Sequence, residues 1–206
     1  MAGNYLSAFK YPWEALGGIK RMIIQLGESL PKEEYLEVNE NVWVHKSAKI
    51  FDSAYLTGPC IIGERSEVRH GAFIRGSVIV GNDCVVGNSA ELKNSILFDE
   101  VHVPHYNYVG DSILGYRVHL GAGAITSNIK SDKTTVFVHD GKQNINTGLR
   151  KFGALIGDNT EIGCNTVLNP GTIIGRNCTI YPLSNVRGVI ENNSIYKSAK
   201  EIVKKR

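Results

Sequence analysis

Aliphatic residues recur every six positions along most of this 206-residue sequence. Neither an α-helix nor an alternating β-strand has a period of six. Three such hexads would instead make one triangular coil, in which each face turns one aliphatic side chain inward. Two steps of five residues shift the phase after residue 92, and the period resumes at residue 156 after an interruption. The repeat comprises Val44, Ile50, Leu56, Ile62, Val68, Ile74, Val80, Val86, Leu92, Leu97, Val103, Val109, Leu114, Leu120, Ile156, Ile162, Leu168, Ile174, Ile180 and Val186.

The residue four positions after each aliphatic residue is usually small or β-branched, as expected of a side chain turned inward beside a tight corner. Cys60, Cys84 and Cys178 occupy this position, so we expect them to pack in the core rather than to carry redox chemistry. Cys164 lies two positions after Ile162 and falls outside this pattern. No cysteine pair has the CxxC spacing of a metal site, so we expect no metal and reduced thiols.

The composition is that of a folded protein, with 42% hydrophobic and 21% charged residues. A formal net charge of +3 is too small to indicate a nucleic-acid partner. No apolar run approaches the ~20 residues that span a bilayer, and residues 1–10 lack the basic start and apolar stretch of a secretory signal. We therefore expect a cytoplasmic protein that binds neither nucleic acid nor membrane.

The two ends of the chain depart from the repeat. Residues 1–40 are expected to form a helical cap, because apolar residues within 11–30 follow the spacing of an amphipathic helix. A solenoid needs its open ends covered, so this helix is expected to cover the first coil. Residues 194–206 are lysine-rich and are predicted to form a short basic helix.

The coiled region is expected to span residues 41–193, with an excursion at 126–155 that lacks the repeat. Within the excursion, two stretches rich in β-forming residues, 134–138 and 143–147, flank Asp140-Gly141. This pattern is typical of a β-hairpin. Long excursions from a rigid scaffold commonly carry function.

Cationic residues stand out at one position of the repeat. Arg75 and Lys93 directly follow aliphatic residues and are eighteen apart, which is one full coil. They should therefore stack at one corner about 4.8 Å apart. Two cations so close repel each other, which indicates either a phosphate or carboxylate ligand between them or two solvated side chains that splay apart. The spacing alone leaves both interpretations open.

The same corner of the next coil is expected to hold Tyr108 and Gly110. The preceding segment contains His105, which would then lie near the cation pair. A histidine beside an anion site can act as a general base near neutral pH. Taken alone, a histidine in a loop is more often a surface residue.

Four motifs carry a resemblance to a known family. They are residues 105–111 (HYNYVGD), 120–128 (LGAGAITSN), 150–159 (RKFGALIGDN) and 169–171 (NPG). The sequence resembles the acetyltransferase domain of the bifunctional glucosamine-1-phosphate acetyltransferase and UDP-N-acetylglucosamine pyrophosphorylase family, and its archaeal members most closely. The resemblance implies an all-β, left-handed parallel β-helix and a cytoplasmic acyltransferase that uses acetyl-CoA.

The resemblance also implies roles for residues at matching positions. His105 matches the general base, and Arg75, Lys93 and Tyr108 match residues that bind the sugar phosphate.

Other family roles depend on a neighbouring subunit. The family's sites lie between adjacent prisms of a trimer, so the resemblance implies a homotrimer. Asn128 and Lys133 match further active-site residues, and His119 stands where the family has an asparagine. All three would lie across from a neighbouring subunit.

The expected coenzyme contacts are Ala122, Cys164 and Tyr181. Cys164 replaces a serine of the family, and Tyr181-Pro182-Leu183 replaces small residues that line the pantetheine path.

The sequence thus predicts an acetyl-CoA-dependent N-acetyltransferase that acts on an amino-sugar 1-phosphate. One alternative is a protein that binds a sugar phosphate or nucleotide sugar without acyl transfer. Another is an accessory protein that works with a separately encoded nucleotidyltransferase, because the nucleotidyltransferase domain of the family is absent from this sequence.

Overall fold

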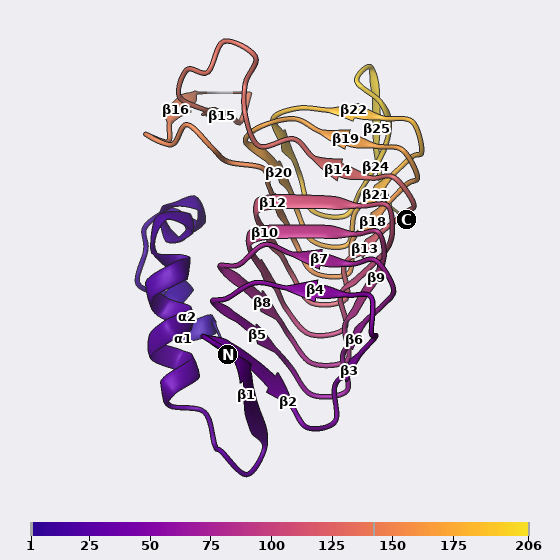
Figure 1. The fold of residues 1–206 in the computed structure, drawn as a ribbon. Helices are drawn as coiled ribbons and strands as arrows, with labels where there is room; N and C mark the ends of the chain where they lie inside the picture. The colour runs from indigo at the N-terminus through magenta and orange to yellow at the C-terminus, as the bar shows by residue number, and fades with distance from the viewer. Residues whose placement is uncertain (1, 142, 206) are drawn as a thin grey trace.

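Parallel strands stacked in successive coils form the main body of the protein (Figure 1). The computed structural model describes residues 2–141 and 143–205. Each coil lies on the previous one in register, so that Ile62 pairs with Val80 and Val80 with Leu97. Most aliphatic residues of the repeat are buried in one continuous core along the axis. The predicted parallel β-solenoid is therefore confirmed.

Three faces make up each coil. The first face contains β2 (Val42–His45), with β1 (Tyr35–Asn39) antiparallel beside it, then β5 (Cys60–Ile62), β8 (Val78–Val80), the second halves of β10 (Glu91–Leu97) and β12 (Tyr108–Leu114), β17 (Ala154–Ile156), β20 (Thr172–Ile174) and β23 (Val189–Ile190). The second face contains β3 (Lys49–Ile50), β6 (Glu67–Val68), β9 (Val85–Asn88), β11 (His102–His105), β13 (His119–Leu120), β18 (Glu161–Ile162) and β21 (Thr179–Ile180). The third face contains β4 (Tyr55–Leu56), β7 (Phe73–Ile74), the first halves of β10 and β12, β14 (Ile125–Thr126), β19 (Val167–Leu168) and β22 (Asn185–Val186). Because β10 and β12 continue through a corner, they join the first and third faces into one sheet.

The small inward position beside the corner holds the three cysteines predicted there. Cys60, Cys84 and Cys178 are buried, whereas Cys164 is exposed. Burial raises the pKa of the Cys60 and Cys84 thiols to about 12, so both stay protonated near neutral pH. These buried cysteines therefore contribute packing, as expected.

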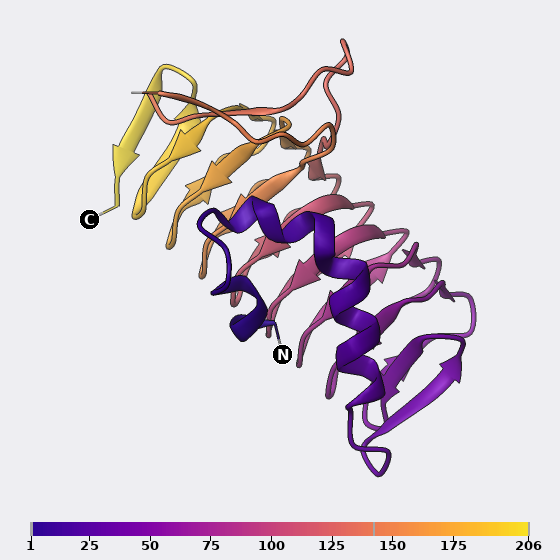
Figure 2. The same cartoon turned by 90° about the vertical axis from the view of Figure 1, so that its left-hand side faces the viewer.

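The N-terminal segment lies along the first face and not over the open end of the first coil, so the predicted end cap is wrong (Figure 2). The segment consists of α1 (Gly3–Leu6), the 3-10 helix η1 (Pro12–Gly18) and α2 (Ile19–Glu28). The single helix expected over 11–30 is thus divided into a 3-10 helix and an α-helix. None of the described helices is long and apolar enough to cross a membrane.

An outward-facing apolar row on the first face explains this placement. The row has one residue per coil, directly before the inward aliphatic residue, and consists of Trp43, Ile61, Ile79, Ile96 and Ile113. The N-terminal segment buries this row in one cluster with Leu16, Ile19 and Ile23. Each such side chain contributes roughly 1.5–3 kcal/mol when it is removed from water. The first face is therefore apolar on both sides, and it needs a cover along its length.

The C-terminal residues form a β-hairpin, so the short basic helix predicted over 194–206 is wrong. β24 (Ser194–Ser198) continues the second face by pairing with β21, and β25 (Glu201–Lys204) folds back antiparallel on β24. Ser194 and Tyr196 are buried, which continues the inward alternation for one more strand. Pairing with the preceding coil outweighs the helical propensity of a lysine-rich segment.

A second hairpin projects from the stack between β14 and β17 (Figure 1). β15 (Phe137–His139) and β16 (Asn144–Asn146) pair antiparallel within the expected excursion. Val136 and Val138 are buried in the cluster that contains the N-terminal helices. The excursion and the N-terminal segment therefore share one apolar cluster beside the corner where β10 and β12 bend.

Candidate functional site

The stacked cations predicted from the sequence do occupy one corner, where the third face meets the first. Arg75 follows β7, and its backbone N–H donates to the carbonyl of Leu92 at 2.8 Å, which places Arg75 beside Lys93. Lys93 in turn pairs with Gly110 of β12. Three successive coils therefore bring Arg75, Lys93 and Gly110 together.

Each cation has a carboxylate of its own. The Arg75 guanidinium donates to Glu91 at 2.6 Å, and the Lys93 ammonium lies 3.1 Å from each carboxylate oxygen of Asp111. The hydrogen bond to Glu91 raises the pKa of Arg75, which stays charged. The protein itself thus supplies a carboxylate to each cation, an arrangement that differs from both interpretations left open by the spacing. No role was predicted for Glu91 or Asp111 from the sequence. Each of them nevertheless occupies the same repeat position as a residue with a predicted role.

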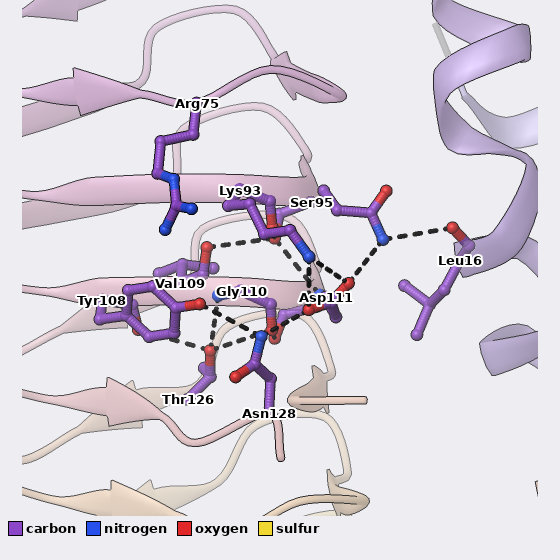
Figure 3. A network of polar contacts seen from close by, with 12 residues as sticks. Leu16, Arg75, Lys93, Ser95, Tyr108, Val109, Gly110, Asp111, Thr126 and Asn128 are labelled. Carbon is purple, nitrogen blue, oxygen red and sulfur yellow. Dashed lines mark hydrogen bonds and ion pairs between the residues drawn. The ribbon is translucent and has the colours of Figure 1, made fainter. Parts of the chain in front are cut away.

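Asp111 is the centre of a buried polar network (Figure 3). Its side chain is 5% exposed, against 33% for Glu91. Besides Lys93, it accepts hydrogen bonds from the side-chain amides of Asn94, at 2.8 Å, and Asn128. A buried carboxylate is costly unless it is paired and hydrogen-bonded, and these donors meet that requirement.

Tyr108 and Asn128 complete the corner. The Asn128 amide donates to the Tyr108 hydroxyl at 3.1 Å as well as to Asp111. A Cβ atom at Gly110 would lie 2.5 Å from the Tyr108 hydroxyl, so only glycine lets the ring lie here. Burial, followed by the charges of Asp111 and Glu91, raises the pKa of Tyr108, which therefore keeps a proton that it can donate to a ligand. Asn128, expected across from a neighbouring subunit, instead belongs to the site of its own chain.

His105 lies at the corner that precedes Tyr108, between the second and third faces. Its side chain is exposed, and within residues 2–141 and 143–205 its imidazole makes no hydrogen bond. The buried Asn107 fixes this corner, because its side chain accepts from the His105 backbone at 3.0 Å and donates to the Gly121 carbonyl at 2.8 Å. His105 is therefore accessible and is separated from Lys93 by the third face, on which the first half of β12 carries Tyr108.

The predicted coenzyme residues line up on the corner that carries His105. The backbone N–H of Gly123 donates to His105, that of Asn165 to Ala122, and that of Leu183 to Cys164. His105, Ala122, Cys164 and Pro182 therefore occupy the same position in four successive coils, and we call this row the His105 ridge. Tyr181 precedes Pro182 and is exposed.

Two expected site residues lie elsewhere. His119 is on the second face, where its Nδ1 lies 2.7 Å from Glu161, beside His102. Burial, and then the charge of His119, lowers the pKa of His102. Lys133 lies in the excursion, where its backbone carbonyl accepts from Arg150. A single chain therefore does not bring His119 to the corner with Lys93. Across the described part of the chain, no three histidine, cysteine or acidic side chains are close enough to hold a metal ion.

Comparison with known families agrees with the fold and the motifs. Residues 153–188 match the family described as bacterial transferase hexapeptide (six repeats), and residues 56–151 match the GMPPB C-terminal domain. The chain is thus similar to hexapeptide-repeat transferases over residues 153–188, in agreement with its parallel β-solenoid.

Individual relatives narrow the similarity further than the family models do. The chain is 32% identical over 208 residues to "Bifunctional protein GlmU" of Methanococcus maripaludis, which covers 98% of this chain and 50% of that protein. It is 33% identical over 150 residues to the "Bifunctional sugar-1-phosphate nucleotidylyltransferase/acetyltransferase" of Sulfurisphaera tokodaii, covering 73% of this chain and 37% of that protein. The resemblance to archaeal members of the bifunctional family is thus confirmed, and the chain spans half or less of these two relatives.

Two further similarities lie outside the archaeal group. The "Uncharacterized acetyltransferase YaiX" of Escherichia coli is 29% identical over 182 residues, which cover 78% of this chain and 76% of that protein. Among solved structures, the acetyltransferase domain of PglB from Neisseria gonorrhoeae in complex with acetyl coenzyme A superposes with a TM-score of 0.43. It is 19% identical and covers 80% of this chain and 57% of that one.

The difference in burial between the two carboxylates yields a stability prediction. Asp111→Asn should lower the free energy of unfolding by roughly 1.5–3 kcal/mol, because a buried charge that accepts several hydrogen bonds is lost. Glu91→Gln, the matched control at the exposed pair, should cost less than about 1 kcal/mol. Urea unfolding of both variants measures the difference. Equal losses would contradict the central place of Asp111.

Proposed function

We propose that this protein is an acetyl-CoA-dependent N-acetyltransferase that acts on an amino-sugar 1-phosphate. The observation that carries the proposal is the placement of two sets of residues on neighbouring corners. Arg75, Lys93 and Tyr108 lie at one corner, and the His105 ridge lies at the other. The similarity to archaeal bifunctional acetyltransferases supports the same assignment.

His105 is proposed as the general base. The substrate amine attacks the thioester carbonyl of acetyl-CoA, His105 accepts the proton that the amine loses, and the tetrahedral intermediate collapses with release of the thiolate of coenzyme A. The His105 imidazole is exposed and has no hydrogen-bond partner among the described residues, so it can accept this proton. General-base assistance of this kind is worth roughly 10²–10⁴-fold in rate.

Arg75 and Lys93 are proposed to hold the phosphate in different ways. Arg75 forms an exposed ion pair with Glu91, and water screens such a pair, so a phosphate can replace Glu91 at low cost. Lys93 stays anchored by Asp111 and still has an ammonium proton to offer a ligand. Tyr108, which retains its proton, is proposed to donate to the sugar.

The roles of the cations and of the histidine can be separated experimentally. Arg75→Ala should weaken binding of glucosamine 1-phosphate about 10- to 100-fold in calorimetry, and it should hardly affect unphosphorylated glucosamine, because a charge-assisted contact exists only with the anion. His105→Ala should lower kcat by roughly 10²–10⁴-fold and leave sugar-phosphate binding nearly unchanged.

The outcomes distinguish the assignments. If His105→Ala weakens binding as much as Arg75→Ala does, the histidine is a binding residue and not the base. If neither variant changes the binding of any sugar phosphate, the corner is a solvated ion-pair cluster and the proposed substrate is wrong.

A homotrimer is proposed because the third face presents apolar side chains beside the site. Tyr55, Phe73 and Ile125 are exposed and occupy the same repeat position as Tyr108, with Glu91 in the coil between Phe73 and Tyr108. The N-terminal segment already covers the first face, so packing between subunits would use the other two. Such packing would also bring Lys133 and His119 of a neighbour towards the site.

Light scattering should therefore give a mass close to three times 22.6 kDa. Ile125→Asp should dissociate the assembly, since it places a charge in the apolar row of the third face. Val38→Asp is the matched control, because Val38 is an exposed aliphatic residue of β1 and lies on neither of these two faces. A monomer mass for the unmodified protein at micromolar concentration would contradict the trimer, and an intact assembly in Ile125→Asp would exclude the third face from the contact.

Binding of a sugar phosphate without acyl transfer is the second candidate, and the end of the His105 ridge favours it. Tyr181 is 42% exposed and Leu183 is 80% exposed, and both stand beyond Cys164 where the family has small residues. Bulky side chains here could fill the path of the coenzyme.

Thermal unfolding separates the two candidates. Acetyl-CoA at about 100 times its dissociation constant should add roughly 2.7 kcal/mol to the stability of the acetyltransferase and raise its Tm. Glucosamine 1-phosphate serves as the control ligand that both candidates bind. A Tm that rises with the sugar phosphate but not with acetyl-CoA would favour the binding protein.

A further inference from the structure

The N-terminal segment makes a direct polar contact with the candidate site (Figure 3). The side-chain amide nitrogen of Asn94 donates to the backbone carbonyl of Leu16 at 3.3 Å. The same nitrogen donates to Asp111 at 2.8 Å. One amide therefore links η1, far away in the sequence, to the carboxylate that anchors Lys93.

A second contact reaches the other side of the network. Trp13 of η1 packs against Phe152, with 6.1 Å between the ring centroids. Phe152 is fully buried, and its backbone N–H donates to the carbonyl of Asn128 at 2.9 Å. Asn128 in turn donates to Asp111 and Tyr108. The segment that covers the first face thus supports Asp111 from both sides.

The two amides determine how strongly Asp111 can interact with Lys93. Asp111 accepts from Asn94 and Asn128 as well as from the ammonium, so its charge is shared among several donors. If the Asn94 donor is lost, more of that charge acts on Lys93. The ammonium is then held more firmly against Asp111, and a phosphate must compete with a stronger protein anion.

We propose that Asn94 is a positioning residue through which the N-terminal segment sets the affinity of the site for phosphate. The proposal rests on the proposed function, since it assigns Lys93 to the phosphate of the substrate. Asn94 does not touch the His105 ridge, so its effect falls on substrate binding and not on the chemical step.

Asn94 offers a clean substitution because its backbone is in the left-handed region, with φ at 49°. Glycine adopts this conformation without strain, so Asn94→Gly removes the amide without disturbing the chain. Asn159 has the same backbone conformation, with φ at 55°, and is exposed at a different corner. Asn159→Gly is therefore the matched control.

The kinetic experiment measures kcat and KM for acetylation of glucosamine 1-phosphate. Asn94→Gly should raise the KM for the sugar phosphate roughly tenfold, the scale of one hydrogen bond to a charged group, and should leave kcat and the KM for acetyl-CoA within twofold. Asn94→Asp should raise it further, because a second carboxylate then faces Lys93 and repels the phosphate. Asn159→Gly should match the unmodified protein. An unchanged KM in both Asn94 variants, or a fall confined to kcat, would overturn the proposal.

A second measurement needs no substrate. Amine labelling with trinitrobenzenesulfonate, read by mass spectrometry, compares Lys93 with the exposed Lys32 in the same sample. Labelling requires the neutral amine, so a tighter pair with Asp111 should slow the labelling of Lys93 in Asn94→Gly and slow it more in Asn94→Asp. If the unmodified protein acetylates no amino-sugar phosphate, the proposed function fails, and labelling still decides the link. Lys93 labelling that is unchanged or faster would reject it.

Discussion

Register between coils is the constraint on which the rest of this structure depends. Backbone hydrogen bonds hold each residue over one particular residue of the coil before, so side chains distant in the sequence become neighbours at a fixed spacing. This places Arg75 beside Lys93 and Lys93 beside Gly110. The same register aligns His105 with Ala122 and Cys164 on the ridge. No local loop conformation has to be adjusted to build the candidate site, because a rigid stack already positions its parts.

Residues whose environment follows from the period could be predicted from the sequence. The stacking of Arg75 on Lys93 and the burial of Cys60 and Cys84 are of this kind, because a six-residue repeat assigns each residue a face and a coil. Outcomes that depend on competition between long-range contacts could not be predicted. The lysine-rich C-terminal segment is locally typical of a helix, yet Ser194–Ser198 pair with β21 as a strand.

The position of the N-terminal segment and the role of the counter-ions could not be predicted from the sequence either. The amphipathic spacing of the N-terminal segment predicts a helix. The surface that this segment covers is an apolar row with one residue per coil, and the six-residue repeat of inward residues obscures that row in the sequence. The role of Asp111 could not be predicted from the sequence for another reason. A carboxylate at a corner looks solvated in the sequence, and only the stack shows that Lys93, Asn94 and Asn128 converge on it.

The two ion pairs at this corner differ in how deeply their carboxylates are buried. Glu91 neutralises Arg75 at the surface, where water weakens the pair and a competing anion can replace it. Asp111 neutralises Lys93 below the surface, where amides hold the carboxylate in place. One cation is thus readily available and the other is fixed in position. A ligand with a phosphate group would find one partner that moves towards it and one that sets where it lies.

Two long strands, β10 and β12, bend through the corner that carries the candidate site. β10 and β12 pass that corner with one residue fewer than the hexad requires, which is why the aliphatic period shortens from Leu92 to Leu97 and again from Val109 to Leu114. The shortened corners hold Lys93-Asn94 in one coil and Gly110-Asp111 in the next. The change in the length of the repeat therefore coincides with the polar network around Asp111. In a solenoid sequence, the positions where a repeat changes length are therefore good candidates for a binding site.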